Sequence, residues 1–210
     1  MAFLTQEEMR RRARQRAARD RMAVEDILKE ASKHHSNDYD IFLSQTIRDA
    51  ELVLGVYDQL TALGFRVFCD WIDSPEIDRS NVTPANADYL RRIMQRSKSL
   101  LYLDTNGAEQ SLWMCWELGW FDGHEGHVAI LPVLSEGSTA YRGREFLGLY
   151  PYVEIDGEGR LKIVRPSATN SRGLTLIEAP NSTTFEGWMR RGEAFMRPRN
   201  IESWGVMHRD

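Results

Sequence analysis

The chain has 210 residues, with 42% hydrophobic and 28% charged side chains, which suits one globular domain carrying an extension. Its net charge of −4 argues against nucleic-acid binding. No apolar run approaches the roughly 20 residues that span a bilayer, and no secretory signal is recognisable, so we expect a cytoplasmic protein without a membrane partner. Cys69 and Cys115 are predicted to be buried thiols, not a disulfide.

Residues 5–33 form a block of their own, rich in arginine and alanine. Thr5 followed by Glu7 and Glu8 suits the start of a helix, because a capping hydroxyl and early acids interact favourably with the helix dipole. A narrow apolar stripe favours docking on the rest of the chain or on a second copy. A membrane-surface helix or a nucleic-acid arm remains an alternative. We therefore predict an N-terminal helix within residues 1–36.

From residue 37 onward, short apolar runs alternate with helical patterns. Strands are predicted at residues 39–44, 65–70, 99–104, 127–134 and 149–155, and helices at 47–63, 84–96 and 111–122. Short connections between strand, helix and strand imply parallel pairing with right-handed crossovers. The alternation predicts an α/β domain over residues 37–155, with a parallel sheet covered by helices on both faces.

Residues 156–210 are predicted to be a C-terminal extension. A turn at its start favours a hairpin with residues 160–164. Residues 166–183 are polar and rich in turn formers, and a last helix is predicted over residues 185–196.

The segment 111–122 places one carboxylate, Glu117, among tryptophans. At 3.6 residues per turn, Trp113, Glu117 and Trp120 share one helix face. Burying a carboxylate among indoles costs free energy, so either a partner offsets the cost or the group has a function. The structural alternative is an ion pair with an arginine of the preceding helix, namely Arg91, Arg92 or Arg96. Among the tryptophans, Trp116 is the one most expected in the core.

Ligands of such sheets bind beyond the carboxyl ends of the strands. The loop after the first strand, the acidic loop at 71–83 and the start of the tryptophan helix meet at this edge. Ser44 is placed to meet a substrate or to cap the next helix, and Asp70 to approach a ribose or cap its loop. Glu117 is placed to face a cleft there.

No metal site is predicted. His124, Glu125 and His127 lie between a predicted helix and a predicted strand, where a turn explains them more simply.

Three segments resemble conserved boxes of Toll/interleukin-1 receptor (TIR) domains, the bacterial members above all. YDIFLSQTIRDAE resembles the first box, and FRVFCDWID resembles the strand that leads into the second loop. RSKSLLYLDTNGAEQSLWMCWELGW resembles the third strand and the helix with the pattern Ser-x-Trp-x-x-x-Glu-Leu, here Ser111, Trp113, Glu117 and Leu118. The resemblance covers about residues 39–135. It implies a flavodoxin-like parallel sheet of five strands.

The resemblance also implies an activity. Many bacterial TIR domains cleave NAD+ at the nicotinamide–ribose bond with the glutamate that corresponds to Glu117. We therefore expect an NAD+ glycohydrolase or ADP-ribosyl cyclase that uses NAD+ as substrate and needs no cofactor. The resemblance further implies self-association through TIR domains and, as in Thoeris antiphage systems, a nucleotide signal to a separate effector. The expected substrate-binding residues are Ser44, Gln45, Asp70, Trp71, Ser111 and Trp113.

The chemistry is compatible with a single carboxylate, because nicotinamide leaves the pyridinium as a neutral group and needs no general acid. Ordinary glycosidases need two carboxylates. Water reaching the ribosyl cation would give linear ADP-ribose, whereas a nucleophile from the same molecule in a dry site would give a cyclic product. No glycine-rich dinucleotide fingerprint follows the first strand, so NAD+ is expected to be consumed and not to carry hydride.

Two other functions remain open at this point. A non-enzymatic TIR adaptor would act by pairing with other TIR domains through residues 71–83, and Glu117 would be dispensable. A nucleoside deoxyribosyltransferase-like enzyme would share the open sheet and a catalytic glutamate, but it would exchange bases on deoxynucleosides.

Overall fold

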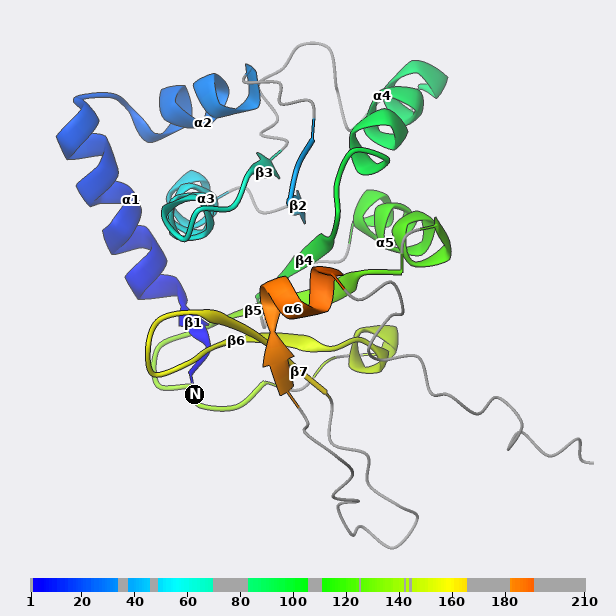
Figure 1. Ribbon diagram of the computed structural model, residues 1–210. Helices are drawn as coiled ribbons and strands as arrows, with labels where there is room; N and C mark the ends of the chain where they lie inside the picture. The colour runs from blue at the N-terminus through cyan, green and yellow to red at the C-terminus, as the bar shows by residue number, and fades with distance from the viewer. Residues whose placement is uncertain are drawn as a thin grey trace, which may run out of the picture.

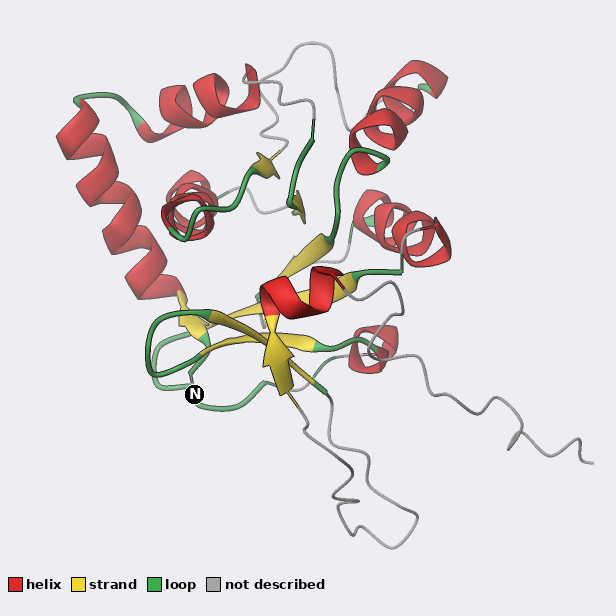
Figure 2. Cartoon of the chain, viewed as in Figure 1, coloured by secondary structure: helices red, strands yellow, loops and turns green. Residues whose placement is uncertain are grey.

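The computed structural model describes residues 2–33, 38–45, 49–69, 83–105, 111–124, 126–141, 143, 145–165 and 182–190. Helices pack on both sides of a central sheet (Figures 1 and 2). The strands are β1 (Leu4–Thr5), β2 (Ile41–Ser44), β3 (Val67–Cys69), β4 (Leu100–Asp104), β5 (Val128–Leu134), β6 (Tyr152–Ile155), β7 (Leu161–Val164) and β8 (Ser182–Thr184). The helices are α1 (Gln6–Asp20), α2 (Val24–Lys33), α3 (Ala50–Ala62), α4 (Pro84–Met94), α5 (Leu112–His124), the 3₁₀ helix η1 (Glu145–Leu149) and α6 (Phe185–Arg190).

The sheet confirms the predicted α/β fold. Its order is β3-β2-β4-β5-β6-β7-β8, and the five strands from β3 to β6 in this order pair in parallel with one another. These are the five predicted strands, each beginning one to three residues later than predicted. Their order along the sheet is the flavodoxin-like one, in which the first strand of the parallel set lies between the second and the third.

The carboxyl-terminal part of the described chain extends the sheet by two strands. The predicted hairpin is present, since β7 pairs antiparallel to β6, and β8 pairs antiparallel to β7. The prediction of an irregular segment up to residue 183 was wrong at Ser182 and Thr183. These polar, half-buried residues show none of the apolar alternation that marks a strand in a sequence. The predicted last helix begins at Phe185, and residues 191–196 lie outside the described ranges.

Two apolar clusters cover the two faces of the sheet, as predicted. Alternate side chains of β2 divide between them, because successive residues of a strand point to opposite faces. Ile41 and Leu43 join α1, α2, α3 and α6 in one cluster. Phe42 joins α4, α5 and η1 in the other.

The amino-terminal segment is two helices and not the single helix that was predicted. Arg21 has a left-handed backbone conformation (φ 53°) and its N–H donates to the carbonyl of Ala17, which ends α1. The chain then turns, so that α2 runs at a steep angle to α1 (Figure 1). A straight helix of this length would extend about 40 Å. The break lets Ile27 and Leu28 of α2 reach the same apolar cluster as α1.

The first residues of the chain also pair with the sheet. Leu4 and Thr5 of β1 lie parallel to Val133 and Leu134 of β5. Ala2 exchanges backbone hydrogen bonds with Ile155 at the end of β6. Strand pairing therefore joins the start of the chain to the sheet that carries the predicted site.

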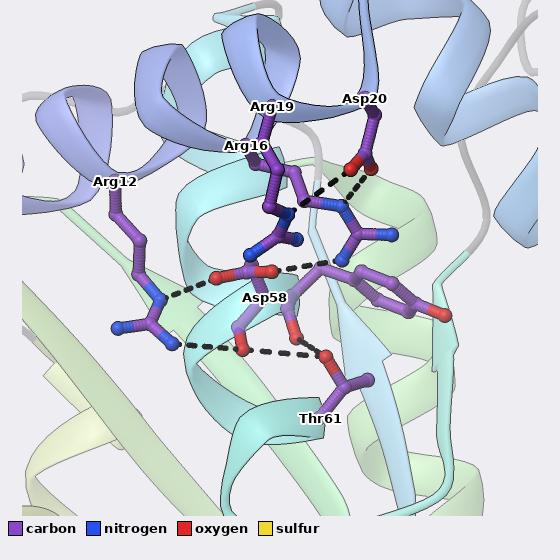
Figure 3. A network of polar contacts seen from close by, with 7 residues as sticks. Arg12, Arg16, Arg19, Asp20, Asp58 and Thr61 are labelled. Carbon is purple, nitrogen blue, oxygen red and sulfur yellow. Dashed lines mark hydrogen bonds and ion pairs between the residues drawn. The ribbon is translucent and has the colours of Figure 1, made fainter.

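Helix α1 packs closely along α3, and arginines pair the two helices. Arg10 contacts Asp49 at 2.8 Å and Arg14 contacts Glu51 at 3.0 Å. Asp58 receives both Arg12 at 2.6 Å and Arg16 at 2.9 Å (Figure 3). The arginine-rich helix thus docks on its own domain, as the favoured interpretation predicted. No helix within the described ranges has the length and hydropathy of a membrane span.

Candidate functional site

The candidate site lies at the carboxyl edge of the parallel strands, on the face that α5 covers. Ser44 is the last residue of β2, and Gln45 follows it. Both side chains are buried, and so is that of Glu117 on α5, with an exposed fraction of 0%. Two of the three predicted features, the end of β2 and helix α5, therefore meet at this edge, whereas residues 71–82 of the acidic loop lie outside the described residues.

Ser44 and Glu117 are hydrogen-bonded. The Ser44 hydroxyl donates to Oε2 of Glu117 at 2.6 Å, a length typical of a hydroxyl on a carboxylate. The alternative role of Ser44 as a helix cap does not apply, because Asp49 caps α3 by accepting from the Leu52 N–H at 3.0 Å. Ser44 is thus available to orient Glu117.

Ser111 holds the start of α5. Its hydroxyl accepts a hydrogen bond from the N–H of Trp113 at 3.2 Å, which satisfies one of the donors at the beginning of the helix. This contact sets where the helix begins, and through it the position of Glu117, which follows Ser111 by six residues.

The tryptophans of α5 differ in burial, and the prediction that Trp116 would be the core member was wrong. Trp113 is 9% exposed and belongs to the core cluster, whereas Trp116 and Trp120 are only half-buried at its rim. Trp113 and Trp116 meet edge to face at 5.3 Å. The helical spacing predicted that Trp113 and Trp116 lie on different faces of α5. It could not show which face is buried, because that depends on how α5 packs against α4 and the sheet.

Arg91, one of the arginines considered as an ion-pair partner of Glu117, is engaged elsewhere. Its guanidinium lies 5.3 Å from the centroid of the Trp116 ring, a cation–π contact. It also pairs with Asp88 at 3.1 Å. These contacts account for the charge of Arg91, one of the three arginines considered.

A second polar pair at this edge was not predicted. Asp104, the last residue of β4, is 3% exposed and accepts a hydrogen bond from the Tyr141 hydroxyl at 2.6 Å. Asp104 could have been found in the sequence, because it ends a predicted strand just as Ser44 does. Nothing in the sequence indicates that Tyr141, in the segment after β5, reaches it.

Two of the predicted substrate-binding residues, Asp70 and Trp71, lie outside the described residues. Their assignment, like that of Gln45, Ser111 and Trp113, stays a prediction.

The histidine and cysteine side chains supply no metal-binding cluster within the described ranges. His127 is buried edge-on against Trp188, and His124 packs on Trp120. Cys69 is buried as predicted, Cys115 is only half-buried, and neither is disulfide-bonded.

An open hollow of about 470 Å³ lies at the opposite, amino edge of the sheet. Its lining includes Asp40 and Lys98, which pair with each other at 2.8 Å. Asp40 also binds Arg66 at 3.2 Å. The hollow lies at the end of the strands opposite to Ser44, and its carboxylate on the side of β2, Asp40, is occupied by two cations, so the hollow is not the candidate site.

Comparison with known proteins gives two relatives. No family model matches the chain. Over 137 residues it is 45% identical to the "Probable 3' cyclic ADP-D-ribose synthase ThsB'" of Bacillus cereus (strain MSX-D12), covering 64% of this chain and 71% of that protein. Over 81 residues it is 26% identical to the "Putative cyclic ADP-D-ribose synthase TIR2" of Cytobacillus dafuensis, covering 38% of this chain and 21% of that protein.

Proposed function

The chain belongs to the Thoeris-type TIR family, and on this premise we propose that it cleaves NAD+ at the nicotinamide–ribose bond and closes the ADP-ribosyl group into cyclic ADP-ribose. The two relatives are named as cyclic ADP-D-ribose synthases, which supports a cyclic product over a linear one. The relative with the longer match is named for a 3′ cyclic product, and this favours a ribose hydroxyl as the group that closes the ring. In this proposal the product is an antiphage signal.

Glu117 is the catalytic carboxylate in this proposal. Breaking the bond to nicotinamide leaves positive charge on the ribose carbon, and the leaving group departs neutral. A carboxylate in a site without water stabilises that charge more strongly than one in water. The observation that supports the proposal is the buried hydrogen bond from Ser44 to Glu117, which holds one carboxylate oxygen at the carboxyl edge of the parallel strands.

Ser44 supports Glu117 without removing its charge. A hydroxyl donating to Oε2 restricts the carboxylate rotamer and supplies a fixed dipole, so less reorganisation is needed when charge develops on the ribose. The indole of Trp113, one turn before Glu117, is proposed to border the same site, where an aromatic ring favours stacking on nicotinamide or adenine.

The proposal is tested by comparing the wild-type chain with Glu117→Gln in cells challenged by phage. Glutamine keeps the size of the side chain and removes its charge. Mass spectrometry of extracted nucleotides should show NAD+ loss and a cyclic ADP-ribose in wild-type cells, and neither in cells with the variant. Equal NAD+ loss in both would remove Glu117 from the reaction. An unchanged NAD+ pool in infected wild-type cells, with defence intact in both strains, would favour the adaptor function.

The remaining partners belong to the same proposal. Self-association through the TIR domain and a separate effector that binds the cyclic nucleotide are both expected of a signalling enzyme. Size-exclusion chromatography of the full chain with and without NAD+ tests the first, and addition of the extracted nucleotide to a candidate effector tests the second.

A further inference from the structure

Asp104, which is buried, and Tyr141, which is half-buried, form the second polar pair at the carboxyl edge. The Asp104 side chain is 3% exposed and Tyr141 donates to its Oδ2 at 2.6 Å. Burying a carboxylate is costly, so natural structures retain one where it is well hydrogen-bonded or has a function. The cleavage of the nicotinamide bond, as proposed above, makes no use of this group.

The pair lies on the same face of the sheet as Ser44 and Glu117. Ser44 of β2 is level with Tyr102 of β4, and Asp104 is two residues further toward the carboxyl edge. Side chains two residues apart on a strand point to the same face, so Asp104, Tyr102 and Ser44 all point to the side that α5 covers. With strands about 4.8 Å apart and about 3.3 Å per residue, the Cα atoms of Ser44 and Asp104 are about 8 Å apart. This spacing fits two groups that act on different parts of one dinucleotide.

Anchoring of the loop is a weaker explanation of the pair. The Tyr141 ring already packs edge to face on Tyr152, with centroids 4.9 Å apart, and contacts Phe3 at 6.2 Å. These contacts hold the ring without a buried charge. A carboxylate has about four acceptor positions, so Asp104 has the capacity to bind Tyr141 and a substrate hydroxyl at the same time.

We propose that Asp104, oriented by Tyr141, binds the ribose hydroxyl of the adenosine half of NAD+ and directs it to the ring-closing step. In this step the bond between the ribose carbon and nicotinamide breaks, and nicotinamide leaves with the bonding electron pair. The hydroxyl oxygen forms the new bond to the same carbon, and its proton passes to Asp104 and then to water. The products are cyclic ADP-ribose, nicotinamide and one proton. The inference rests on the proposed function, and it assigns product choice to Asp104 while Glu117 serves bond cleavage.

The two carboxylates should therefore be separable by experiment. Extracts of phage-challenged cells that contain the full chain are supplied with isotope-labelled NAD+, and labelled nicotinamide, cyclic product and linear ADP-ribose are measured. Asp104→Asn should lower the ratio of cyclic to linear product by at least about 10-fold while nicotinamide release stays within about 3-fold of wild type. Tyr141→Phe should lower the ratio by about 5-fold, the value of one lost hydrogen bond. Asp88→Asn, which removes an exposed carboxylate on α4, is the control and should change neither quantity.

The outcomes distinguish the inference from the proposed function. An unchanged ratio of cyclic to linear product in Asp104→Asn would overturn the role of Asp104. So would a fall of cyclic product that is matched by an equal fall of nicotinamide release in Asp104→Asn and in Tyr141→Phe. Absence of nicotinamide release from the wild-type extract would overturn the proposed function and the inference together. Thermal unfolding of each purified variant shows whether it is folded. If Asp104→Asn is not folded, the ratio in Tyr141→Phe decides.

Discussion

Ser44 and Glu117 are 73 residues apart in the sequence and 2.6 Å apart in the structure, joined by a hydrogen bond between the end of β2 and the middle of α5. Because both side chains are almost completely buried, this bond works in a low-dielectric environment where its geometry is well defined. The position of the Glu117 carboxylate therefore depends on the position of Ser44 at the end of β2. Measurable consequences follow for catalysis and for the parts of the fold that support the strand.

Removal of the Ser44 hydroxyl should slow catalysis more than it weakens binding. A hydrogen bond to a charged group contributes about 1.5–3 kcal/mol, so Ser44→Ala should lower kcat by roughly 10- to 100-fold if the bond matters mainly in the transition state. KM for NAD+ should change by less than about 3-fold. Initial rates of nicotinamide release measure both.

Ser99→Ala is the matched control for this prediction. Ser99 is also fully buried, and its hydroxyl donates to the carbonyl of Asp40 at 2.7 Å, at the amino edge of the sheet. Its loss should lower stability but leave kcat near wild type. Equal effects of the two variants on kcat would show that Ser44 acts only through stability.

Gly55 should not accept a side chain. A Cβ at this position of α3 would lie 1.9 Å from the carbonyl oxygen of Met9 on α1, and backbone atoms cannot yield as a flexible side chain can. Gly55→Ala should lower the free energy of unfolding by roughly 2–3 kcal/mol, because the two helices must separate. Urea denaturation measures this change.

Gly123→Ala on α5, where nothing lies within 4 Å, is the control and should instead raise the free energy of unfolding by roughly 0.5–1 kcal/mol. An unchanged free energy of unfolding in Gly55→Ala would contradict the close packing of α1 on α3.

Asp58 should be the most important acid of the α1–α3 contact. Its side chain is 12% exposed and pairs with both Arg12 and Arg16, so removal of its charge leaves two guanidinium groups without their shared partner. We expect Asp58→Asn to lower the free energy of unfolding by roughly 2 kcal/mol. This is less than the loss of a fully buried ion pair would cost, because both arginines are partly exposed to solvent. Asp88→Asn, in an exposed pair with Arg91, should cost less than about 0.5 kcal/mol. A similar loss in both variants would mean that the Asp58 cluster contributes no more than a surface pair.

Asp40 should make stability sensitive to acid. Burial raises the pKa of this carboxyl group, but hydrogen bonds from Arg66 and Lys98 outweigh burial and hold its pKa well below the ordinary value of 3.8. Since the folded-state pKa is depressed, the stabilisation is complete above pH 4 or so and is lost as the pH falls further. Wild type should exceed Asp40→Asn by roughly 2 kcal/mol at pH 7, and the difference should shrink between about pH 4 and pH 2. Unfolding curves across this range test it, and a difference that does not depend on pH would refute the assigned cause.

The sequence was sufficient for the parallel sheet because each of its strands is a short apolar run followed by a helical pattern. It was also sufficient to place Ser44 and Glu117 at one edge, since that follows from the order of elements. It did not show the break at Arg21, because a left-handed arginine has no recognisable signal in a single sequence. The pair of Asp104 and Tyr141 was missed for a different reason. Their contact spans 37 residues and depends on the path of the chain after β5, which no local pattern determines.

The arginine pairs between α1 and α3 also link the amino terminus to the site. Asp49 caps α3 and at the same time binds Arg10, and it follows the buried Gln45 by only four residues. Helices joined by such contacts are expected to open as one cooperative unit, which amide hydrogen exchange would detect as a shared protection factor. Local opening of α1 would then loosen the cap of α3 and, through it, the strand end that holds Ser44 against Glu117. We therefore expect α1, although far from Glu117 in the sequence, to support the position of this carboxylate.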